Sequence, residues 1–265
     1  MLQTDLLAGL TAVVTGGSQG LGLATAQALA SHGARIFILD LKEAQAHQAA
    51  AALPITAHTS GEHGAFLCDV RKDQDRKAAI QTIIERSGRI DVLVNNAGIQ
   101  YHAPGEAIDE EKWRDLFETN VHAVMFMSRD VAPYMLKQGS GSIINIGSLL
   151  SVLGMPRRTA YGASKTAVIG ITRSLGVEWA GRGLRVNAIC PGYHKTPLLQ
   201  EYIDKGLVDE ERIRTRIPMG RLGPMEAIGN AAVFLASPLS SYITGQYLLV
   251  DGGYSTFGAP EDASS

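Results

Sequence analysis

The amino-acid sequence predicts an α/β fold, in which a doubly wound parallel β-sheet carries helices on both faces. Three observations support this fold class. Short apolar runs rich in β-branched residues alternate with longer stretches of helical periodicity along the whole chain, as in sheets built from strand–helix–strand units. A glycine cluster, GGSQGLG, stands directly between the first apolar run and the first helical stretch. No linker, low-complexity segment or internal repeat divides the chain, so residues 1–265 are expected to form a single domain.

The expected strands are short and apolar, with glycine or polar residues at their ends. The first reads LTAVVT, and the second, RIFIL, ends before an acidic residue. The fourth runs into the sequence NNAG, and the sixth is broken by a Pro-Gly pair. The seven strands are expected at Leu10–Thr15, Arg35–Leu39, Ala65–Cys68, Ile90–Val94, Ser142–Ile146, Arg185–Cys190 and Tyr247–Val250.

Helical periodicity fills most of the intervals between these strands. Pro133 falls within the longest helical stretch and is expected to kink or interrupt it. Residues 194–220 include the polar, amphipathic segment Leu198–Arg216 and are expected to form a mobile lid over a substrate, and residues 258–265 are expected to be a frayed tail. The main helices are expected at Leu21–His32, Lys42–Leu53, Lys72–Ser87, Glu111–Gln138, Tyr161–Ala180 and Met225–Ala236.

The composition argues against several classes of protein. With a net charge of −2 and no basic stripe, nothing indicates a nucleic-acid partner. No apolar stretch reaches the roughly 18 residues of a membrane span, and the amino terminus lacks the basic region of a signal peptide. Cys68 and Cys190 both lie in apolar, strand-like segments, which suits small core residues of a protein in a reducing cytoplasm. No metal site is expected.

The glycine cluster has the position that a nucleotide-binding loop requires, between a strand and a helix. Its spacing, G-x-x-x-G-x-G, places Gly16, Gly20 and Gly22 where the backbone can approach a pyrophosphate, and the following helix offers unpaired N–H groups. The alternative is a tight turn without a ligand.

Asp40 follows the second strand and lies eighteen residues after Gly22. This is close to the spacing of about 20 residues expected for an acid that binds the ribose of a dinucleotide. A carboxylate there accepts hydrogen bonds from a 2′-hydroxyl and repels a 2′-phosphate, and Lys42 is the only base nearby, so NAD is expected rather than NADP. The alternative is that Asp40 caps the helix that starts near Glu43.

A serine, a tyrosine and a lysine form the candidate catalytic group. Tyr161 and Lys165 are four residues apart on an expected helix, so they share one face. A free tyrosine has a pKa of about 10, and a cation within roughly 4–6 Å lowers such a pKa toward the working pH of an acid–base catalyst. Ser148 can hold a substrate oxygen beside the tyrosine. The alternative is a surface helix that carries both side chains by chance.

Asparagine residues mark two further positions. The run Asn95-Asn96-Ala97-Gly98 ends the fourth strand, where small residues line the ligand-binding crevice of such sheets. Asn120 lies within an apolar helical segment, and a polar residue there needs a partner or a function.

Together these motifs resemble the short-chain dehydrogenase/reductase family, of the single-domain kind. The motifs are Thr15-Gly16-x-x-x-Gly20-x-Gly22, Asp69, Asn95-Asn96-Ala97-Gly98, Asn120, Ser148, Tyr161-x-x-x-Lys165 and Pro191-Gly192, and the resemblance extends from about Leu7 to Phe257. It implies seven parallel strands in the order 3-2-1-4-5-6-7, a homotetramer or homodimer, and the interconversion of an alcohol and a ketone.

The resemblance also implies roles for individual residues. Tyr161 is the acid and base, Ser148 binds the reacting oxygen, Lys165 binds the nicotinamide ribose and lowers the tyrosine pKa, and Asn120 holds a water that relays protons. Asp69 and Val70 contact the adenine, and Thr196 the carboxamide. The implied cofactor-binding residues are Gly16, Ser18, Gln19, Gly20, Leu21, Gly22, Asp40, Leu41, Asp69, Val70, Asn96, Ala97, Gly98, Tyr161, Lys165, Pro191, Gly192, His194 and Thr196.

Within the family, the chain looks most like sugar, polyol and sugar-acid dehydrogenases, the gluconate 5-dehydrogenases among them. The candidate substrate residues suit a polar ligand, and an arginine can clasp a carboxylate with two parallel hydrogen bonds. His194 stands where the family usually has an aliphatic residue, and its side chain faces either solvent or the pocket. Besides Ser148 and Tyr161, the candidates are Gln100, His102, Arg157, Arg158 and His194.

Two alternative functions remain at this point. One is an NADPH-dependent 3-oxoacyl-thioester or carbonyl reductase. The other is a dinucleotide-binding regulator without catalytic activity, although such proteins usually lose one of the four polar residues Asn120, Ser148, Tyr161 and Lys165, all of which are present here.

Overall fold

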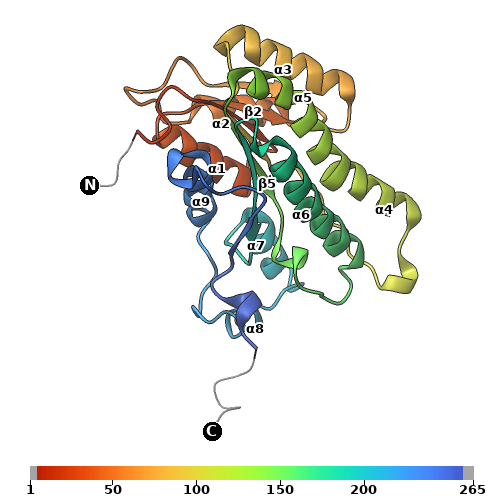
Figure 1. The fold of residues 1–265 in the computed structure, drawn as a ribbon. Coiled ribbons are helices and arrows are strands. Elements are labelled where there is room, and N and C mark those ends of the chain that lie inside the picture. Colours follow the sequence, from red (N-terminus) through yellow and green to blue (C-terminus); the bar gives the residue numbers. More distant parts are fainter. Residues whose placement is uncertain (1–4, 259–265) are drawn as a thin grey trace.

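The computed structural model describes residues 5–258 and contains a seven-stranded parallel sheet. The strand order is β3-β2-β1-β4-β5-β6-β7, with every neighbouring pair parallel, so the expected fold class and strand order are confirmed (Figure 1). The expected tail at residues 259–265 lies outside the described residues. The strands are β1 (Thr11–Thr15), β2 (Arg35–Asp40), β3 (Gly64–Leu67), β4 (Val92–Asn95), β5 (Gly141–Ile146), β6 (Leu184–Pro191) and β7 (Tyr247–Val250).

Helices cover both faces of the sheet, as predicted. On one face, α1 (Gly20–Ser31), α2 (Glu43–Ala51) and α9 (Glu226–Ala236) pack against the strands. On the other face lie α3 (Asp73–Ser87), α5 (Ala123–Gln138) and α6 (Thr159–Ala180). Successive residues of β1 alternate between the two cores, with Val14 in the first and Val13 in the second. Because both faces are covered, the central strands are mostly apolar rather than alternating, and the polar residues within them, such as Asn145 and Asn187, are buried.

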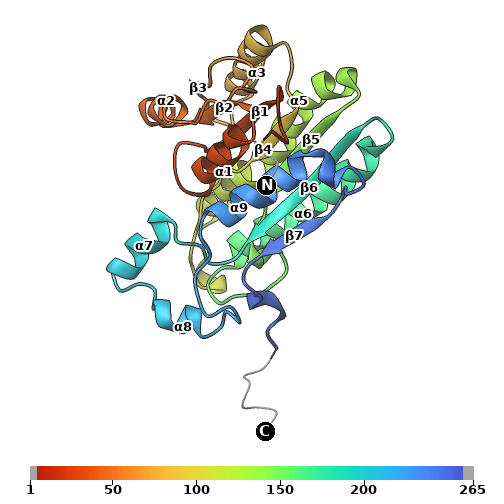
Figure 2. The same ribbon diagram turned by 90° about the vertical axis from the view of Figure 1, so that its left-hand side faces the viewer.

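Two short helices stand away from the sheet between β6 and α9. They are α7 (Pro197–Asp204) and α8 (Glu210–Arg214), and Figure 2 shows both of them at one end of the molecule, below α1. Thr196 caps α7, since its side chain accepts a hydrogen bond from the backbone N–H of Leu199, and Asp209 caps α8 in the same way through Arg212. These caps explain why a largely polar segment is helical.

The long helical stretch is interrupted, but the predicted position of the interruption is wrong. Pro133 lies inside a continuous α5. Pro133 and Arg129, whose carbonyl loses its helical partner, are both exposed, so water can satisfy that carbonyl. The interruption occurs at a five-residue π-helical turn, Glu118–His122, between α4 (Glu110–Phe117) and α5. Such turns occur frequently at functional sites, and this one contains Asn120.

Candidate active site

The residues singled out in the sequence converge at the carboxyl-terminal edge of the sheet. The glycine loop follows β1, the NNAG run ends β4, Ser148 follows β5 and Pro191 ends β6. This is the edge at which open α/β sheets bind their ligands. A cavity of about 590 Å³ opens at the opposite edge, near the amino-terminal ends of β5 and β6, so cavity size alone does not locate the site.

The backbone of the glycine loop requires glycine at its named positions. Gly16 and Gly20 have φ angles of 61° and 56°, in the left-handed region that side chains disfavour. A Cβ on Gly22 would lie 2.3 Å from the carbonyl oxygen of Gly16 and 2.4 Å from Nδ2 of Asn96. A larger residue at position 22 would therefore force the loop away from the end of β4.

The NNAG run fixes this loop in place. Asn96 Nδ2 donates hydrogen bonds to the carbonyl oxygens of Thr15 and Gly16 at 3.0 and 2.9 Å. The hydroxyl of Thr15 accepts hydrogen bonds from the backbone N–H groups of Asn96 and Ala97, both at 3.0 Å. The side chain of Asn96 thus holds the loop, a role that the sequence reasoning missed.

The loop has features that suit a phosphate group. The hydroxyl of Ser18 is buried and has no hydrogen-bond partner within residues 5–258, although buried polar groups are normally paired. The backbone N–H of Ser18 donates to Asp40 Oδ2 at 3.1 Å. The glycine cradle and this unpaired hydroxyl together fit the pyrophosphate of a dinucleotide.

Asp40 connects the glycine loop to the segment after β2. Its second carboxylate oxygen accepts a hydrogen bond from the backbone N–H of Lys42 at 3.0 Å. Lys42 is the N-cap of α2, and no side chain caps that helix. Asp40 therefore does not cap α2 as the alternative interpretation proposed, and its carboxylate lies beside the loop. Leu41 is 62% exposed at the same edge.

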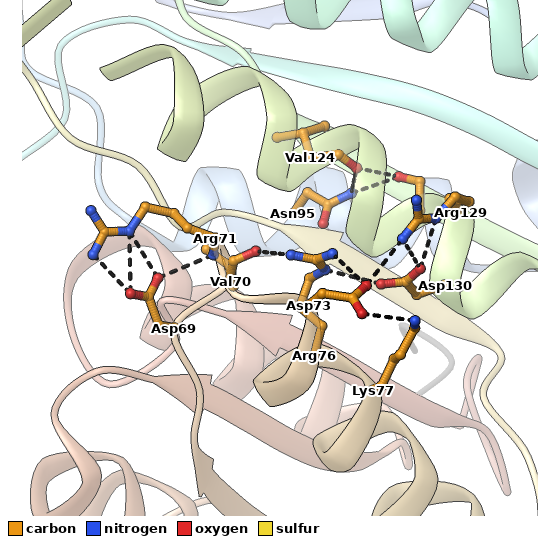
Figure 3. Close-up of polar contacts among 11 residues, drawn as sticks. Asp69, Val70, Arg71, Asp73, Arg76, Lys77, Asn95, Val124, Arg129 and Asp130 are labelled. Carbon is orange, nitrogen blue, oxygen red and sulfur yellow. Dashed lines mark hydrogen bonds and ion pairs between the residues drawn. The ribbon is translucent and has the colours of Figure 1, made fainter. Parts of the chain in front are cut away.

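Two arginines that the sequence reasoning missed hold the turn after β3 (Figure 3). Arg71 pairs with Asp69 through two hydrogen bonds of 2.9 and 2.7 Å, and this bond lowers the pKa of Asp69 below its ordinary value. Arg76 is buried, and it donates to the carbonyl oxygen of Val70 and to Asp130 of α5, both at 2.9 Å. The expected adenine-binding residues Asp69 and Val70 are therefore held rigidly from two sides.

Ser148 is positioned by the short turn that it begins. Its hydroxyl accepts a hydrogen bond from the backbone N–H of Leu150 at 3.1 Å, and its own N–H donates to the hydroxyl of Ser151 at the same distance. Ser151 in turn donates to the backbone carbonyl of Lys165 at 2.8 Å. This chain of hydrogen bonds fixes Ser148 relative to α6, which carries Tyr161 and Lys165.

Lys165 is buried beside the residues that position Ser148. Its ammonium donates a 2.8 Å hydrogen bond to the carbonyl oxygen of Ile146 and lies 5.7 Å from the ring centroid of Tyr161. Burial lowers the pKa of Lys165 to about 8, because the charged form loses its hydration. The prediction that the tyrosine and lysine share one face of a helix is confirmed.

The pKa of Tyr161 shifts in the direction opposite to the one predicted. Burial raises the pKa of its phenol above the ordinary value, and the Ser148 hydrogen bond and the charge of Arg158 only partly oppose this rise. Lys165 does not produce the expected lowering here, because its ammonium is directed to Ile146 and lies over the ring. In this structure the phenol is therefore neutral at neutral pH and can act as a proton donor.

Asn120 is fully buried in the π-helical turn and binds the backbone of Ile99 from both sides. Its Nδ2 donates to the carbonyl of Ile99 at 3.0 Å, and its Oδ1 accepts from the N–H of Ile99 at 2.9 Å. A Cβ on Gly98 would lie 3.1 Å from Asn120 Oδ1 and 3.6 Å from Lys165 Nζ. Asn120 and Lys165 thus approach the same small residue, and glycine leaves space between them.

The candidate substrate residues differ in where the structure places them. His102 lies 3.1 Å from Oε1 of Gln100, and its ring meets the ring of Tyr202 of α7 edge-on at 6.3 Å. Arg157 is exposed and has a φ angle of 63°. The adjacent Arg158 is instead half-buried, at the N-cap of the helix that carries Tyr161.

His194 is buried and does not face solvent. Its side chain is 4% exposed and packs so closely that a Cβ on Gly223 would lie 2.7 Å from the ring. Its Nδ1 lies 3.2 Å from the carbonyl oxygen of Gly192, and burial lowers the pKa of the imidazole. His194 therefore joins the chain after β6 to the chain before α9, and the expectation of a solvated side chain is wrong.

Comparison with known proteins agrees with this geometry. A family model described as "Enoyl-(Acyl carrier protein) reductase" matches residues 16–255. A 3-oxoacyl-[acyl-carrier-protein] reductase of Thermotoga maritima is 37% identical over 250 residues, which cover 93% of this chain and 98% of that protein. The chain belongs to the short-chain dehydrogenase/reductase family. As a member of this family, it is an NAD(P)-dependent oxidoreductase that acts on CH–OH groups.

Sugar dehydrogenases of this family are equally similar. A gluconate 5-dehydrogenase of Gluconobacter oxydans is 39% identical over 251 residues, which cover 93% of this chain and 95% of that protein. The crystal structure of a gluconate 5-dehydrogenase from Burkholderia cenocepacia J2315, in complex with NADP and tartrate, superposes with a TM-score of 0.89. It is 35% identical and covers 97% of this chain and 100% of its own. The resemblance to sugar and sugar-acid dehydrogenases is therefore confirmed, although the reductases match as well.

Within residues 5–258, no helix combines the length and the apolar content that a membrane crossing requires.

Proposed function

We propose that this protein uses NAD to interconvert a secondary alcohol and a ketone on a polyol, a sugar or a sugar acid. The observation that supports this most strongly is the arrangement of three side chains at one edge of the sheet. The phenol of the half-buried Tyr161 hydrogen-bonds to Ser148, its ring centroid lies 5.7 Å from the ammonium of Lys165, and the glycine loop after β1 ends at the same edge.

In the proposed mechanism the bound nicotinamide supplies the hydride chemistry. In ketone reduction, Tyr161 donates its proton to the substrate oxygen as alkoxide character develops there, and in oxidation the phenolate takes that proton back. Ser148 donates a second hydrogen bond to the same oxygen. Lys165 places a positive charge near the phenol, and Asn120 keeps the Ile99 backbone against α6 so that the space beside Gly98 stays open.

The dinucleotide would be held by residues of three segments. The glycine loop with Ser18 suits the pyrophosphate, the turn with Asp69 and Val70 suits the adenine, and Asp40 suits the adenosine ribose. Gly192 and Thr196 lie beside the nicotinamide end in this proposal. The preference for NAD depends on Asp40, because a carboxylate there would repel the 2′-phosphate of NADP.

The preference for NAD can be tested with the substitution Asp40→Asn. The amide removes the charge and keeps one of the two acceptor oxygens, so it can accept from the N–H of Ser18 or of Lys42 but not from both. We expect the ratio of kcat/KM for NAD to that for NADP to fall by about 10-fold or more, since each 1.4 kcal/mol of repulsion corresponds to a factor of ten. If the wild-type protein already prefers NADP, the assignment of Asp40 is wrong.

The function itself is tested by a screen. Polyols, sugars, sugar acids and 3-hydroxyacyl thioesters are offered with NAD or with NADP, and the reduced cofactor is measured by absorbance. Oxidation of a polyol, sugar or sugar acid supports the proposal. Exclusive turnover of the thioester with NADP would favour the second candidate, a 3-oxoacyl-thioester reductase, which the similarity to the Thermotoga maritima reductase makes the main alternative.

Three further expectations belong to this proposal. Residues 194–220, with α7 and α8, would form a lid over the substrate, and His194 packed on Gly223 would anchor its base.

Strand β7 has a sheet partner, β6, on one side only among residues 5–258. The homodimer or homotetramer in this proposal pairs subunits along this edge, and light scattering after size-exclusion chromatography measures its size. The unpaired buried cysteines Cys68 and Cys190 suit the reducing cytoplasm.

A further inference from the structure

Arg158 is a half-buried cation without an acidic partner. It directly precedes α6 and lies three residues before Tyr161. Within residues 5–258, its guanidinium forms no ion pair and no side-chain hydrogen bond. Burial lowers the pKa of Arg158, and the groups that oppose this shift are three phenols, those of Tyr193, Tyr202 and Tyr161.

The other arginines that are buried or paired in this protein are satisfied. Arg71 and Arg89 each bind an aspartate through two hydrogen bonds. The buried Arg76 binds Asp130 and Asp73. Arg185, which is also partly buried and has no acidic partner, donates to the hydroxyl of Ser240 at 2.7 Å. Among the arginines that are not exposed, Arg158 alone has no hydrogen-bond or ion-pair partner for its guanidinium within residues 5–258, and an unpaired, partly buried cation is costly.

The surroundings of Arg158 belong to the substrate side of the site. Tyr202 comes from α7, in the segment proposed as the lid, and its ring also meets that of His102. Tyr193 follows β6, and its hydroxyl lies 3.7 Å from the sulfur of Met155. Arg158 is the N-cap of α6 and lies three residues, about one helical turn, before Tyr161, and its charge lowers the pKa of that phenol. An anion bound to Arg158 would therefore lie beside the proposed proton donor.

We propose that Arg158 binds a carboxylate of the substrate and so selects hydroxy acids and sugar acids over neutral polyols. This inference rests on the proposed function and narrows its substrate class. Two parallel N–H groups of the guanidinium would clasp the carboxylate, and the lid tyrosine would exclude water from the pair. Arg157, four residues before Tyr161, is also a candidate in the sequence, but its side chain is exposed.

The test uses matched substrates that differ only in the charged group, such as gluconate and glucitol or threonate and threitol. In each pair a carboxylate replaces a hydroxymethyl group. For the wild-type protein we expect a higher kcat/KM with the acid. Arg158→Met keeps the apolar stem and removes the charge, and we expect it to lower kcat/KM for the acid about 100-fold, while the neutral partner changes less than about 5-fold. Arg158→Lys restores the charge without the planar fork, and we expect partial recovery.

Two further variants and one binding measurement make the outcome decisive. Arg182, just after α6, is exposed, and Arg182→Met controls for the loss of a surface arginine. Arg157→Met tests whether Arg157, instead of Arg158, binds the carboxylate. If Arg158 acts only on Tyr161, Arg158→Met lowers kcat/KM for the acid and for the polyol by the same factor, and that result overturns the proposal. A loss of the preference for the acid in Arg157→Met, but not in Arg158→Met, overturns it as well. If no pair is oxidised, the proposed function fails, and the same pairs are titrated by calorimetry against the NADH-loaded protein. Equal binding of acid and polyol then overturns the role of Arg158 as well.

Discussion

Replacing Tyr161 by phenylalanine is expected to lower kcat for alcohol oxidation about 1,000-fold, within the 10²–10⁴ range of general acid–base catalysis. The substitution removes only the hydroxyl, and the half-buried ring keeps its packing at the start of α6. The dissociation constant for NADH is expected to change less than about threefold, because most of the proposed dinucleotide contacts belong to the glycine loop and to the segments after β2 and β3. Stopped-flow absorbance at the wavelength of NADH measures the first quantity, and fluorescence titration measures the second.

Tyr134→Phe serves as the matched control for this variant. Tyr134 lies on α5, is also partly buried, and belongs to none of the segments proposed to bind the dinucleotide or the substrate. We expect that variant to retain wild-type kcat. Retention of more than a tenth of the wild-type kcat by Tyr161→Phe would mean that another group carries the proton.

Replacing Lys165 by methionine is expected to lower activity and raise stability at the same time. The resemblance implies that this ammonium binds the nicotinamide ribose, and the loss of a hydrogen bond from a charged group costs about 2 to 3 kcal/mol, or roughly 100-fold in kcat/KM for NAD. The same charge is costly to bury. The pKa of Lys165 falls from 10.5 to about 8 in the folded protein, which corresponds to about 3 kcal/mol of destabilisation at pH 7.

The pH dependence of this effect has a definite sign. Between pH 8 and 10.5 the unfolded chain binds more protons at this lysine than the folded protein does, so the stability of the wild type rises with pH in that window. Denaturant unfolding at pH 7 and pH 9.5 is expected to show Lys165→Met more stable at pH 7, with the difference from the wild type shrinking by about 2 kcal/mol at pH 9.5. A variant that is less stable at pH 7 would show that the hydrogen bond to Ile146 outweighs the burial of the charge.

Much of the fold could be predicted from local sequence patterns. Apolar runs separated by helical stretches identified all seven strands, and their order followed from the family resemblance. The spacing of Tyr161 and Lys165 was enough to place both on one helix face. Pro133 was misleading because its effect depends on whether the freed carbonyl reaches water, and that depends on which face of α5 is exposed.

The parts of the site that could not be predicted depend on distant or adjacent residues. Arg76 secures the adenine-side turn through Asp130, which is 54 residues away. His194 is buried because Gly223 leaves room for its ring. Arg157, four residues before Tyr161, was the arginine favoured by the sequence, but it has a left-handed backbone and an exposed side chain, whereas the adjacent Arg158 is half-buried. The direction of the Tyr161 pKa shift likewise depends on burial, which the spacing of two side chains does not reveal.

In the proposed mechanism, the phenol of Tyr161 exchanges a proton with the substrate while the nicotinamide exchanges a hydride. Its most direct test is the rate of alcohol oxidation between pH 6 and pH 8, measured with a carbinol-deuterated substrate to establish that hydride transfer limits the rate. Because the raised pKa of Tyr161 leaves little phenolate in this range, we expect the wild-type rate to rise by nearly tenfold per pH unit and the residual rate of Tyr161→Phe to lose that slope. A wild-type rate that does not change with pH, or the same slope in both proteins, would contradict the claim.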